Sequence, residues 1–216
     1  DYHAGIEVAL AIERGVEIES RAAIRREELV ELVEQTRPDR LVILGDLMHS
    51  IGDPGGRERE EIEDLVAALP ALPITLVKGN HDGAIEEWVP RVDVTDGSGI
   101  RLGDVGVAHG HTWPAPTVLE AEVVCVGHEH PQVRLEDEVG GSRIERSWLR
   151  GPMAERPFRE RIPELDWTAP ELVVLPAFNA LAGGTWINVE GQEFLAPFLP
   201  EGLASGEAFL LDGTRL

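Results

Sequence analysis

The sequence has almost no cysteine and few aromatic residues. Its single cysteine, Cys125, lies in an apolar run over residues 123–126 and has no partner for an internal disulfide. One cysteine also excludes a zinc site built from several thiolates. A buried, reduced thiol is the expected state of such a residue, so we expect a cytoplasmic protein.

Long hydrophobic runs are also missing. No stretch approaches the roughly 18 apolar residues that a membrane-spanning helix needs, and no signal-like segment is visible, so we expect no membrane partner. No linker, repeat or low-complexity segment divides the 216 residues, which predicts a single domain over 1–216. The chain opens on Asp1-Tyr2-His3, and a ligand-bearing loop should follow a strand, so we expect a short strand before Asp1.

Lysine is nearly absent. Lys78 is the single lysine among 19 basic residues, 40 residues are acidic, and the net charge is −21. Strong acidity with little lysine is typical of a protein adapted to high salt, where ions screen self-repulsion, although an ordinary acidic cytosolic protein would also fit. The negative charge of the protein opposes attraction to nucleic acid, which is also negatively charged. High salt would screen this repulsion, so nucleic acid is a partner that the charge alone does not support. The arginines of residues 143–161 either meet a phosphate or, as we favour, alternate with glutamate on a solvated face.

The first part of the sequence alternates helices and strands and predicts an α/β fold. Amphipathic patterns predict helices over 20–35, with Ser20 as N-cap, and over 57–69. Short apolar runs predict buried strands over 41–44 and 74–77. Each strand ends on a polar cluster, which is where open α/β sheets place their sites.

After Trp88 the pattern becomes that of a meander. Short strands are expected at 92–94, 100–102 and 105–108, and an apolar strand at 123–126. Residues 132–138 and 142–150 predict a hairpin. The stretch 152–168, rich in proline and arginine, predicts a surface excursion. Strands are predicted again at 172–175 and 208–211.

The histidines carry the strongest functional signal. All lie in the first 130 residues, in or beside loops that contain glycine, aspartate or asparagine. A lone histidine is more often structural or solvated than a ligand. Their joint placement with Asp1, Asp46, Asn80 and Asp82 instead predicts a dinuclear metal site. The seven are His3, His49, His81, His109, His111, His128 and His130.

The ligand types indicate which metals the site takes. Carboxylate, amide oxygen and imidazole together suit Mn²⁺, Fe²⁺, Ni²⁺ or Zn²⁺, whereas oxygen ligands alone would suit Mg²⁺. We expect two divalent ions, with Mn²⁺ as first choice. Asp46 is the natural bridge, because a carboxylate can place one oxygen on each of two ions about 3.5–4 Å apart.

Five short motifs occur in order along the chain: Asp1-x-His3, Gly45-Asp46, Gly79-Asn80-His81-Asp82, His109-Gly110-His111 and Gly127-His128-x-His130. In this order they resemble the calcineurin-like metallophosphoesterase superfamily. The resemblance implies a four-layer αββα sandwich, with two mixed β-sheets packed face to face and flanked by helices. It implies that one ion is held by Asp1, His3, Asp46 and His130, and the other by Asp46, Asn80, His109 and His128.

The resemblance also implies a reaction, hydrolysis of a phosphoester by a hydroxide generated on the two ions. His81 would stabilise the developing charge and protonate the leaving oxygen, with Asp82 orienting its imidazole. In the family, an aspartate often follows the Gly-Asp motif at a wider spacing, whereas here the nearby polar residue is His49. Two roles are equally open for His49: contact with the substrate, or a structural role in the loop. His109 and His111 could both serve as ligand. We prefer His109, because the family's ligand usually stands immediately before a glycine.

The expected partner is a phosphoester substrate. Residues 45–49, together with 176–179 and 183–184, resemble the small phosphodiesterases associated with DNA ligases and helicases, including archaeal members. This closer resemblance implies a phosphodiester such as a nucleotide or a DNA end. A phosphomonoesterase and a non-catalytic scaffold on the same fold are the alternatives. A scaffold would have lost ligands, and because every expected ligand is present we favour an enzyme.

Overall fold

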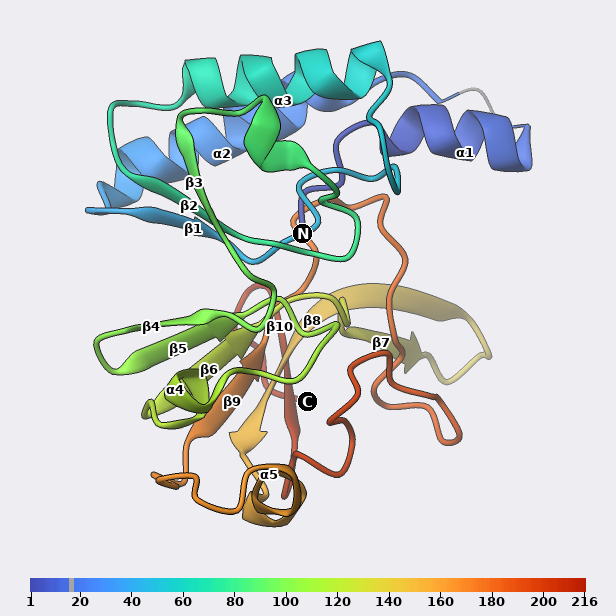
Figure 1. Cartoon of the computed structure of the whole chain (residues 1–216). Coiled ribbons are helices and arrows are strands. Elements are labelled where there is room, and N and C mark those ends of the chain that lie inside the picture. Colours follow the sequence, from blue (N-terminus) through green and yellow to red (C-terminus); the bar gives the residue numbers. More distant parts are fainter. Residues whose placement is uncertain (16–17) are drawn as a thin grey trace.

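A computed structural model describes residues 1–15 and 18–216 as two β-sheets that face each other between helices (Figure 1). Helices α2 (Ala22–Thr36) and α3 (Gly56–Ala68) cover the outer face of the first sheet. Helices α4 (Pro116–Leu119) and α5 (Glu155–Arg161) cover the second sheet. The predicted α/β fold, a four-layer sandwich, is confirmed.

The first sheet holds three parallel strands in the order β1-β2-β3. They are β1 (Leu41–Ile43), β2 (Ile74–Val77) and β3 (Val92–Thr95). All four residues of β2 are buried, because helices cover one face of this strand and the second sheet covers the other. The prediction of a meander from residue 92 is wrong for β3, which pairs in parallel with β2. Of the three short strands expected in the meander, only those at residues 100–102 and 105–108 pair with each other in antiparallel orientation.

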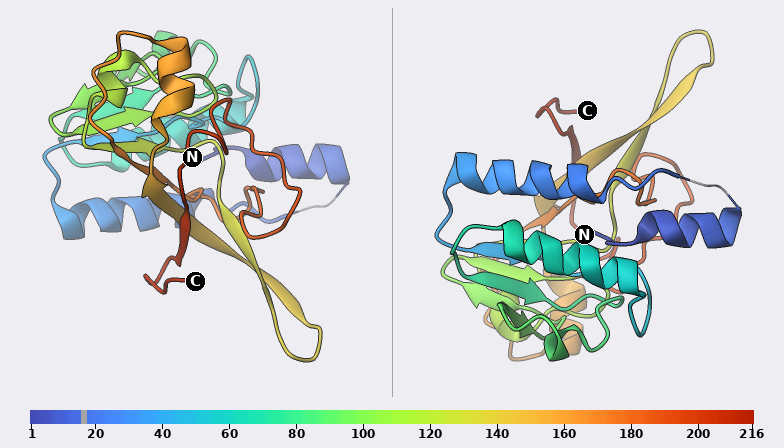
Figure 2. Two further views of the ribbon diagram at one scale, coloured as in Figure 1. Left: turned by 90° about the horizontal axis from the view of Figure 1, so that it is seen from below. Right: turned by 90° about the horizontal axis from the view of Figure 1, so that it is seen from above.

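The second sheet is mixed, with strand order β10-β8-β9-β6-β5-β4, and β7 pairs with β8 off this path. Strands β5, β6 and β9 run parallel to one another, and the other pairs are antiparallel. The hairpin of β7 and β8 extends away from the rest of the molecule (Figure 2). The strands are β4 (Ile100–Leu102), β5 (Val105–Ala108), β6 (Val123–Val126), β7 (Gln132–Glu136), β8 (Ser142–Pro152), β9 (Glu171–Val174) and β10 (Glu207–Leu210).

Residues 152–168 are not the surface excursion that their composition predicts. They contain α5, whose Phe158 is fully buried in the core beneath the second sheet. The Trp167 ring stacks on Phe158 with 5.7 Å between centroids, and Leu165 is buried beside them. Three apolar side chains therefore outweigh the charged residues around them and fasten the segment to the sheet.

The helix predicted over 20–35 is present as α2, but its buried face differs from the prediction. Ile24 and Leu32 are 46% and 47% exposed, whereas Arg25 is buried. Arg21, and not Ser20, occupies the N-cap position. The reason for the buried arginine lies in helix α1 (Ile6–Arg14), which the sequence patterns did not predict.

Helices α1, α2 and α3 meet at a buried ion triad. The Arg25 guanidinium donates to both Glu7 oxygens at 2.6 and 3.1 Å, and to Glu61 Oε1 at 2.6 and 3.2 Å. Glu61 Oε2 also accepts a bond from the Gly5 backbone N–H at 3.0 Å. The Arg25 guanidinium thus joins three helices. Gly5, which donates to Glu61 of this triad, lies two residues from His3.

Two further predictions concern exposure and membranes. Cys125 is free, but it is only partly buried, on the β6 face that packs toward the first sheet, and burial raises the pKa of its thiol. Within residues 1–15 and 18–216, no helix combines the length and apolar character needed to cross a membrane.

Candidate dinuclear metal centre

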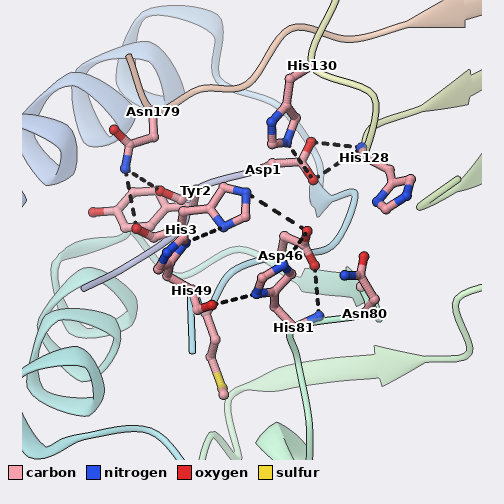
Figure 3. Close-up of polar contacts among 12 residues, drawn as sticks. Asp1, Tyr2, His3, Asp46, His49, Asn80, His81, His128, His130 and Asn179 are labelled. Atoms are coloured by element: carbon pink, nitrogen blue, oxygen red, sulfur yellow. Dashed lines mark hydrogen bonds and ion pairs between the residues drawn. The ribbon is translucent and has the colours of Figure 1, made fainter. Parts of the chain in front are cut away.

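The predicted ligands meet between the two sheets, at the ends of β1, β2, β5 and β6 (Figure 3). Residues 1–4 join them by running beside the loop that follows β1. The backbone N–H groups of Tyr2 and His3 both donate to the Asp46 carbonyl, at 3.0 and 2.9 Å, and Ala4 forms a parallel bridge with Met48. Side chains that are far apart in the sequence therefore point into one space.

Within the described residues, three groups of side chains could each hold an ion, and one of them consists of His3, His49 and His81. In each group the ligand atoms all lie within 4.8 Å of one another. The other two groups match the two ligand sets expected from the sequence, apart from Asn80 and the shared Asp46. One group contains Asp1, His3 and His130, and the other contains Asp46, His109 and His128.

The Asp46 carboxylate lies between the two groups. Its Oδ2 is 3.9 Å from His3 Nε2 on one side and 3.4 Å from His109 Nε2 on the other. Two ligand atoms that each lie about 2.1 Å from one tetrahedral ion are separated by about 3.4 Å. The separations therefore suit atoms that share a metal, and Asp46 is placed to bridge.

His109, and not His111, faces this space. The His109 Nδ1–H donates to the Leu44 carbonyl at 2.5 Å, which leaves Nε2 as the acceptor nitrogen, 3.2 Å from Asn80 Oδ1. His111 belongs to none of the metal-holding groups found among the described residues. Its ring centroid is 5.2 Å from that of His109 and 6.0 Å from that of His128.

An unpartnered nitrogen supports the presence of a metal. His130 Nδ1–H donates to the Gly183 carbonyl at 2.8 Å, and the other ring nitrogen, Nε2, is buried without a hydrogen-bond partner. This Nε2 lies 3.4 Å from Asp1 Oδ1. A buried polar atom without a partner costs about 1–3 kcal/mol, and a metal ion would remove that cost.

The backbone is strained at the same residues. Outside glycine, six described residues have positive φ, and four of them are candidate ligands. Such conformations are unfavourable for residues with a side chain, and they persist where the surroundings over-determine them. The four are His3 (φ 49°), Asp46 (φ 46°), His128 (φ 62°) and His130 (φ 46°).

Burial keeps three of the imidazoles neutral, whereas interactions with neighbouring side chains and backbone keep the Asp46 carboxylate charged. Burial lowers the pKa of His3 to about 2, and those of His128 and His130 to about 4. Burial opposes ionisation of Asp46, but interactions with the His109 ring and with His81, including the hydrogen bond from the His81 backbone N–H, outweigh it and hold the pKa of Asp46 below its usual range. At neutral pH the donor set is therefore already in the form that binds cations.

Two glycines let the loops approach. A Cβ at Gly79 would lie 2.2 Å from Asp46 Oδ1, and a Cβ at Gly45 would lie 2.3 Å from His109 Nδ1. Gly45 also has a φ of +88°. Any side chain at either position would displace a ligand.

The structure corrects the role expected for Asp82. This residue is fully buried, and its carboxylate accepts bonds from the backbone N–H groups of Met48 at 3.0 Å and Gly79 at 2.8 Å. It thus joins the loops that carry Asp46 and Asn80. The His81 ring is oriented instead by the His49 carbonyl, which accepts from His81 Nδ1 at 2.5 Å.

His49 lies beside the first ligand group. Its Nδ1 is 3.2 Å from His3 Nδ1, and its backbone N–H donates to Glu58 Oε1 at 2.6 Å. The contact reaches the side of the His3 ring opposite Asp46, which is where a residue that orients a metal ligand would sit. Of the two roles left open by the sequence, this geometry favours the structural one.

Two residues contact the ligand loops without having been predicted. Glu129 is fully buried between His128 and His130, and Asn179 is 1% exposed against residues 2 and 3. Glu129 stands inside the Gly-His-x-His motif at a position that the motif does not specify. Asn179 belongs to residues 176–179, whose sequence signal was a family resemblance and not a pattern that marks ligands.

Comparison with known proteins places the chain in a family. A model described as calcineurin-like phosphoesterase matches residues 20–167. No curated protein matches, but 13 chains of solved structures do. One, titled "Crystal structure of Pseudomonas putida nuclease MPE", is 20% identical with a TM-score of 0.61, covering 97% of this chain and 81% of that chain. At this identity the likeness supports the fold alone. Because the family model spans more than half of the sequence, this chain belongs to the calcineurin-like phosphoesterase family.

Proposed function

We propose that this enzyme, a metal-dependent hydrolase of phosphoesters, acts on phosphodiesters with two Mn²⁺ ions bound. The observation that supports the dinuclear centre is the position of the Asp46 carboxylate between two groups of metal-binding side chains. In this proposal one ion takes Asp1, His3, Asp46 and His130, and the other takes Asp46, Asn80, His109 and His128.

Each part of the chain has a defined task in this proposal. Two bound divalent ions would activate water and neutralise the non-bridging oxygens of the phosphoester. His81 donates Nδ1–H to the His49 carbonyl, so its Nε2 is the atom free to hold the proton that the leaving oxygen requires. The His81 side chain is 22% exposed, more than His3, His109 or His130, and it can therefore reach a substrate that enters from solvent.

A phosphodiester is proposed as the substrate class on two grounds. Residues 45–49, 176–179 and 183–184 resemble those of the small ligase- and helicase-associated phosphodiesterases, and one structural neighbour is titled a nuclease. The arginines near residues 143–161 do not form a phosphate-binding cluster. Arg143, Arg150, Arg156 and Arg159 each pair with a glutamate. Substrate recognition is thus assigned to the metal centre, in a cytoplasmic protein adapted to salt.

Hydrolysis of two model esters tests this proposal. The purified chain is stripped with chelator, reloaded with Mn²⁺ in molar KCl, and assayed on bis-p-nitrophenyl phosphate and p-nitrophenyl phosphate. We expect faster turnover of the diester. Faster turnover of the monoester would indicate a phosphomonoesterase, and no turnover of either ester with two ions bound would indicate a scaffold.

Two substitutions test the assigned roles. His81→Ala should keep the metal content and lose most turnover, by about 10²–10⁴-fold, which is the usual contribution of a general acid. Asp46→Ala should lose metal. Unchanged turnover in the first variant would remove His81 from the chemistry, and two ions bound to the second would refute the bridge.

A further inference from the structure

We propose that residues 176–185, here called the strap, hold one half of the metal centre in place, and that Asn179 is the positioning residue at its middle. The inference rests on the proposed dinuclear centre. The strap follows β9 and passes beside Asp1, His3 and His130, which are the three side chains of the first ligand group. Figure 3 shows Asn179 pointing at the backbone of residues 2 and 3.

The first end of the strap fastens the segment that carries Asp1 and His3. The backbone N–H groups of Phe178 and Asn179 donate to the Asp1 carbonyl at 3.0 and 3.4 Å. The Asn179 side-chain Nδ2 donates to the carbonyls of Tyr2 and His3 at 3.0 and 3.3 Å. Four bonds thus connect this end of the strap to three consecutive carbonyls.

The far end of the strap fastens the loop that carries His130. The Gly183 carbonyl accepts the bond from His130 Nδ1, which fixes the tautomer whose Nε2 faces Asp1. The Thr185 hydroxyl donates to Glu129 Oε1 at 2.5 Å, and its backbone N–H donates to the Glu129 carbonyl at 3.2 Å. The strap therefore links two ligand loops more than 120 residues apart in the sequence.

Asparagine suits this position for a chemical reason. Both hydrogens of its amide nitrogen are used by carbonyl oxygens, and its Oδ1 accepts a bond from the Leu181 N–H at 3.0 Å. With 1% of its surface exposed, no water would replace these bonds. His3 has a φ of 49°, so its peptide is held in an unfavourable conformation that the Asn179 bond helps to stabilise.

Two of the three side chains of the second ligand group are held by other contacts, whereas the third, His128, shares the loop of His130 and donates its backbone N–H to the Asp1 carboxylate. Asp46 accepts from the His81 N–H, and His109 donates to the Leu44 carbonyl. Neither Asp46 nor His109 has a hydrogen bond with the strap among the described residues. Loss of the Asn179 amide should therefore weaken the first ion site more than the second.

The test measures Mn²⁺ binding rather than turnover. Wild type, Asn179→Ala and Thr185→Val are stripped with chelator and titrated with Mn²⁺ by equilibrium dialysis and electron paramagnetic resonance. The control is Asn188→Ala, because Asn188 also donates through Nδ2 to a carbonyl, that of Arg134, and accepts through Oδ1 from the Arg134 N–H, but its partner carries no ligand. Unfolding midpoints of all four proteins are recorded without metal.

We expect wild type and control to bind two Mn²⁺ per chain, with the signal of a coupled pair. Asn179→Ala should bind an ion at the second site with nearly normal affinity and an ion at the first site, that of Asp1, His3 and His130, about 10- to 100-fold more weakly, which is the usual effect of losing a contact that orients a ligand. It should therefore show the signal of isolated Mn²⁺. Thr185→Val should also weaken Mn²⁺ binding at the first site, and this variant replaces Asn179→Ala in the test if Asn179→Ala does not fold. Equal weakening of both ions, or no weakening, would overturn the inference. Absence of metal from the wild type would instead overturn the dinuclear centre itself.

Discussion

Replacement of Arg25 by methionine should destabilise the fold far more than replacement of the neighbouring Arg26. Arg25 is buried between Glu7 and Glu61 with three contacts of 3.1 Å or less, and methionine keeps most of its apolar stem. Arg26 forms one bond of 3.0 Å to Asp64, whose side chain is 59% exposed. The two substitutions therefore remove the same charge from adjacent positions of one helix.

The expected magnitudes follow from burial. Removal of one partner from a buried ion pair typically costs about 3–5 kcal/mol, because the remaining charge stays buried without compensation. An exposed pair contributes about 0–1 kcal/mol. In a chain of this length, 1 kcal/mol corresponds to about 2–4 °C in melting temperature, so Arg25→Met should melt about 6–20 °C lower and Arg26→Met at most about 4 °C lower.

The cost should also depend on pH. Burial raises the pKa of Glu7, but in the wild type the hydrogen bonds from Arg25 and from the Arg21 backbone outweigh burial and lower it. Without Arg25 the raising effect remains, so the folded state of the variant takes up a proton at a higher pH than the unfolded chain does. The difference in unfolding free energy between the wild type and Arg25→Met should therefore shrink as the pH falls toward 4.5.

Urea unfolding of the metal-free proteins at pH 7 and pH 5 in constant KCl measures these effects. Arg25→Met combined with Glu7→Gln and Glu61→Gln should recover much of the lost stability at pH 7, because no uncompensated charge remains. If Arg25→Met and Arg26→Met unfold at the same urea concentration, or if the triple variant is no more stable than Arg25→Met, the assignment of the cost to buried charge is wrong.

Three other predictions concern the metal loops and the charge. Gly45→Ala should displace His109 and lose bound Mn²⁺. Gly52 has a φ of +105° but open space around it, so Gly52→Ala should keep its metal and lose only about 1–2 kcal/mol of unfolding free energy. Metal analysis and urea unfolding distinguish the two variants. Burial lowers the pKa of His130 from 6.5 to about 4, so between these pH values the unfolded chain binds a proton at this residue and the folded chain does not. This residue should therefore lower the unfolding free energy of the metal-free protein by about 2 kcal/mol when the pH falls from 7 to 5. In unfolding experiments, His130→Gln should lose correspondingly less stability over the same pH range. With a net charge of −21, the melting temperature should rise between 0.1 and 2 M KCl, and a flat or falling curve would contradict adaptation to salt.

Most of the elements and the candidate ligands could be predicted from the sequence, because both depend on local patterns. Strands β2, β4, β5 and β6 have the predicted bounds, since each is a short segment of apolar or alternating residues between turn residues. The ligands stand directly after such runs, and parallel strands bring their carboxyl ends to one edge of the sheet. The spacing of the motifs therefore predicted which side chains meet.

The remaining features depend on contacts between distant residues. The pattern of β3 is the same whether it pairs with β2 or β4, so the local sequence did not show which sheet it joins. Arg25 reads as part of a polar helix face until Glu7 and Glu61 are known to lie beside it. Asp82 follows His81 directly, which predicted a contact between them, but the turn of the chain directs its carboxylate at Met48 and Gly79.

The link between Asn179 and His3 has a consequence for synthesis of the chain. These two residues are 176 positions apart, and ribosomes add about 5–20 residues per second, so His3 waits about 9–35 s before its partner exists. Throughout that interval the segment of Asp1 to His3 lacks the hydrogen bonds that Phe178 and Asn179 donate to its carbonyls. If the proposed metal centre forms, we expect its first ion site to reach full affinity only after the C-terminal part of the chain has docked.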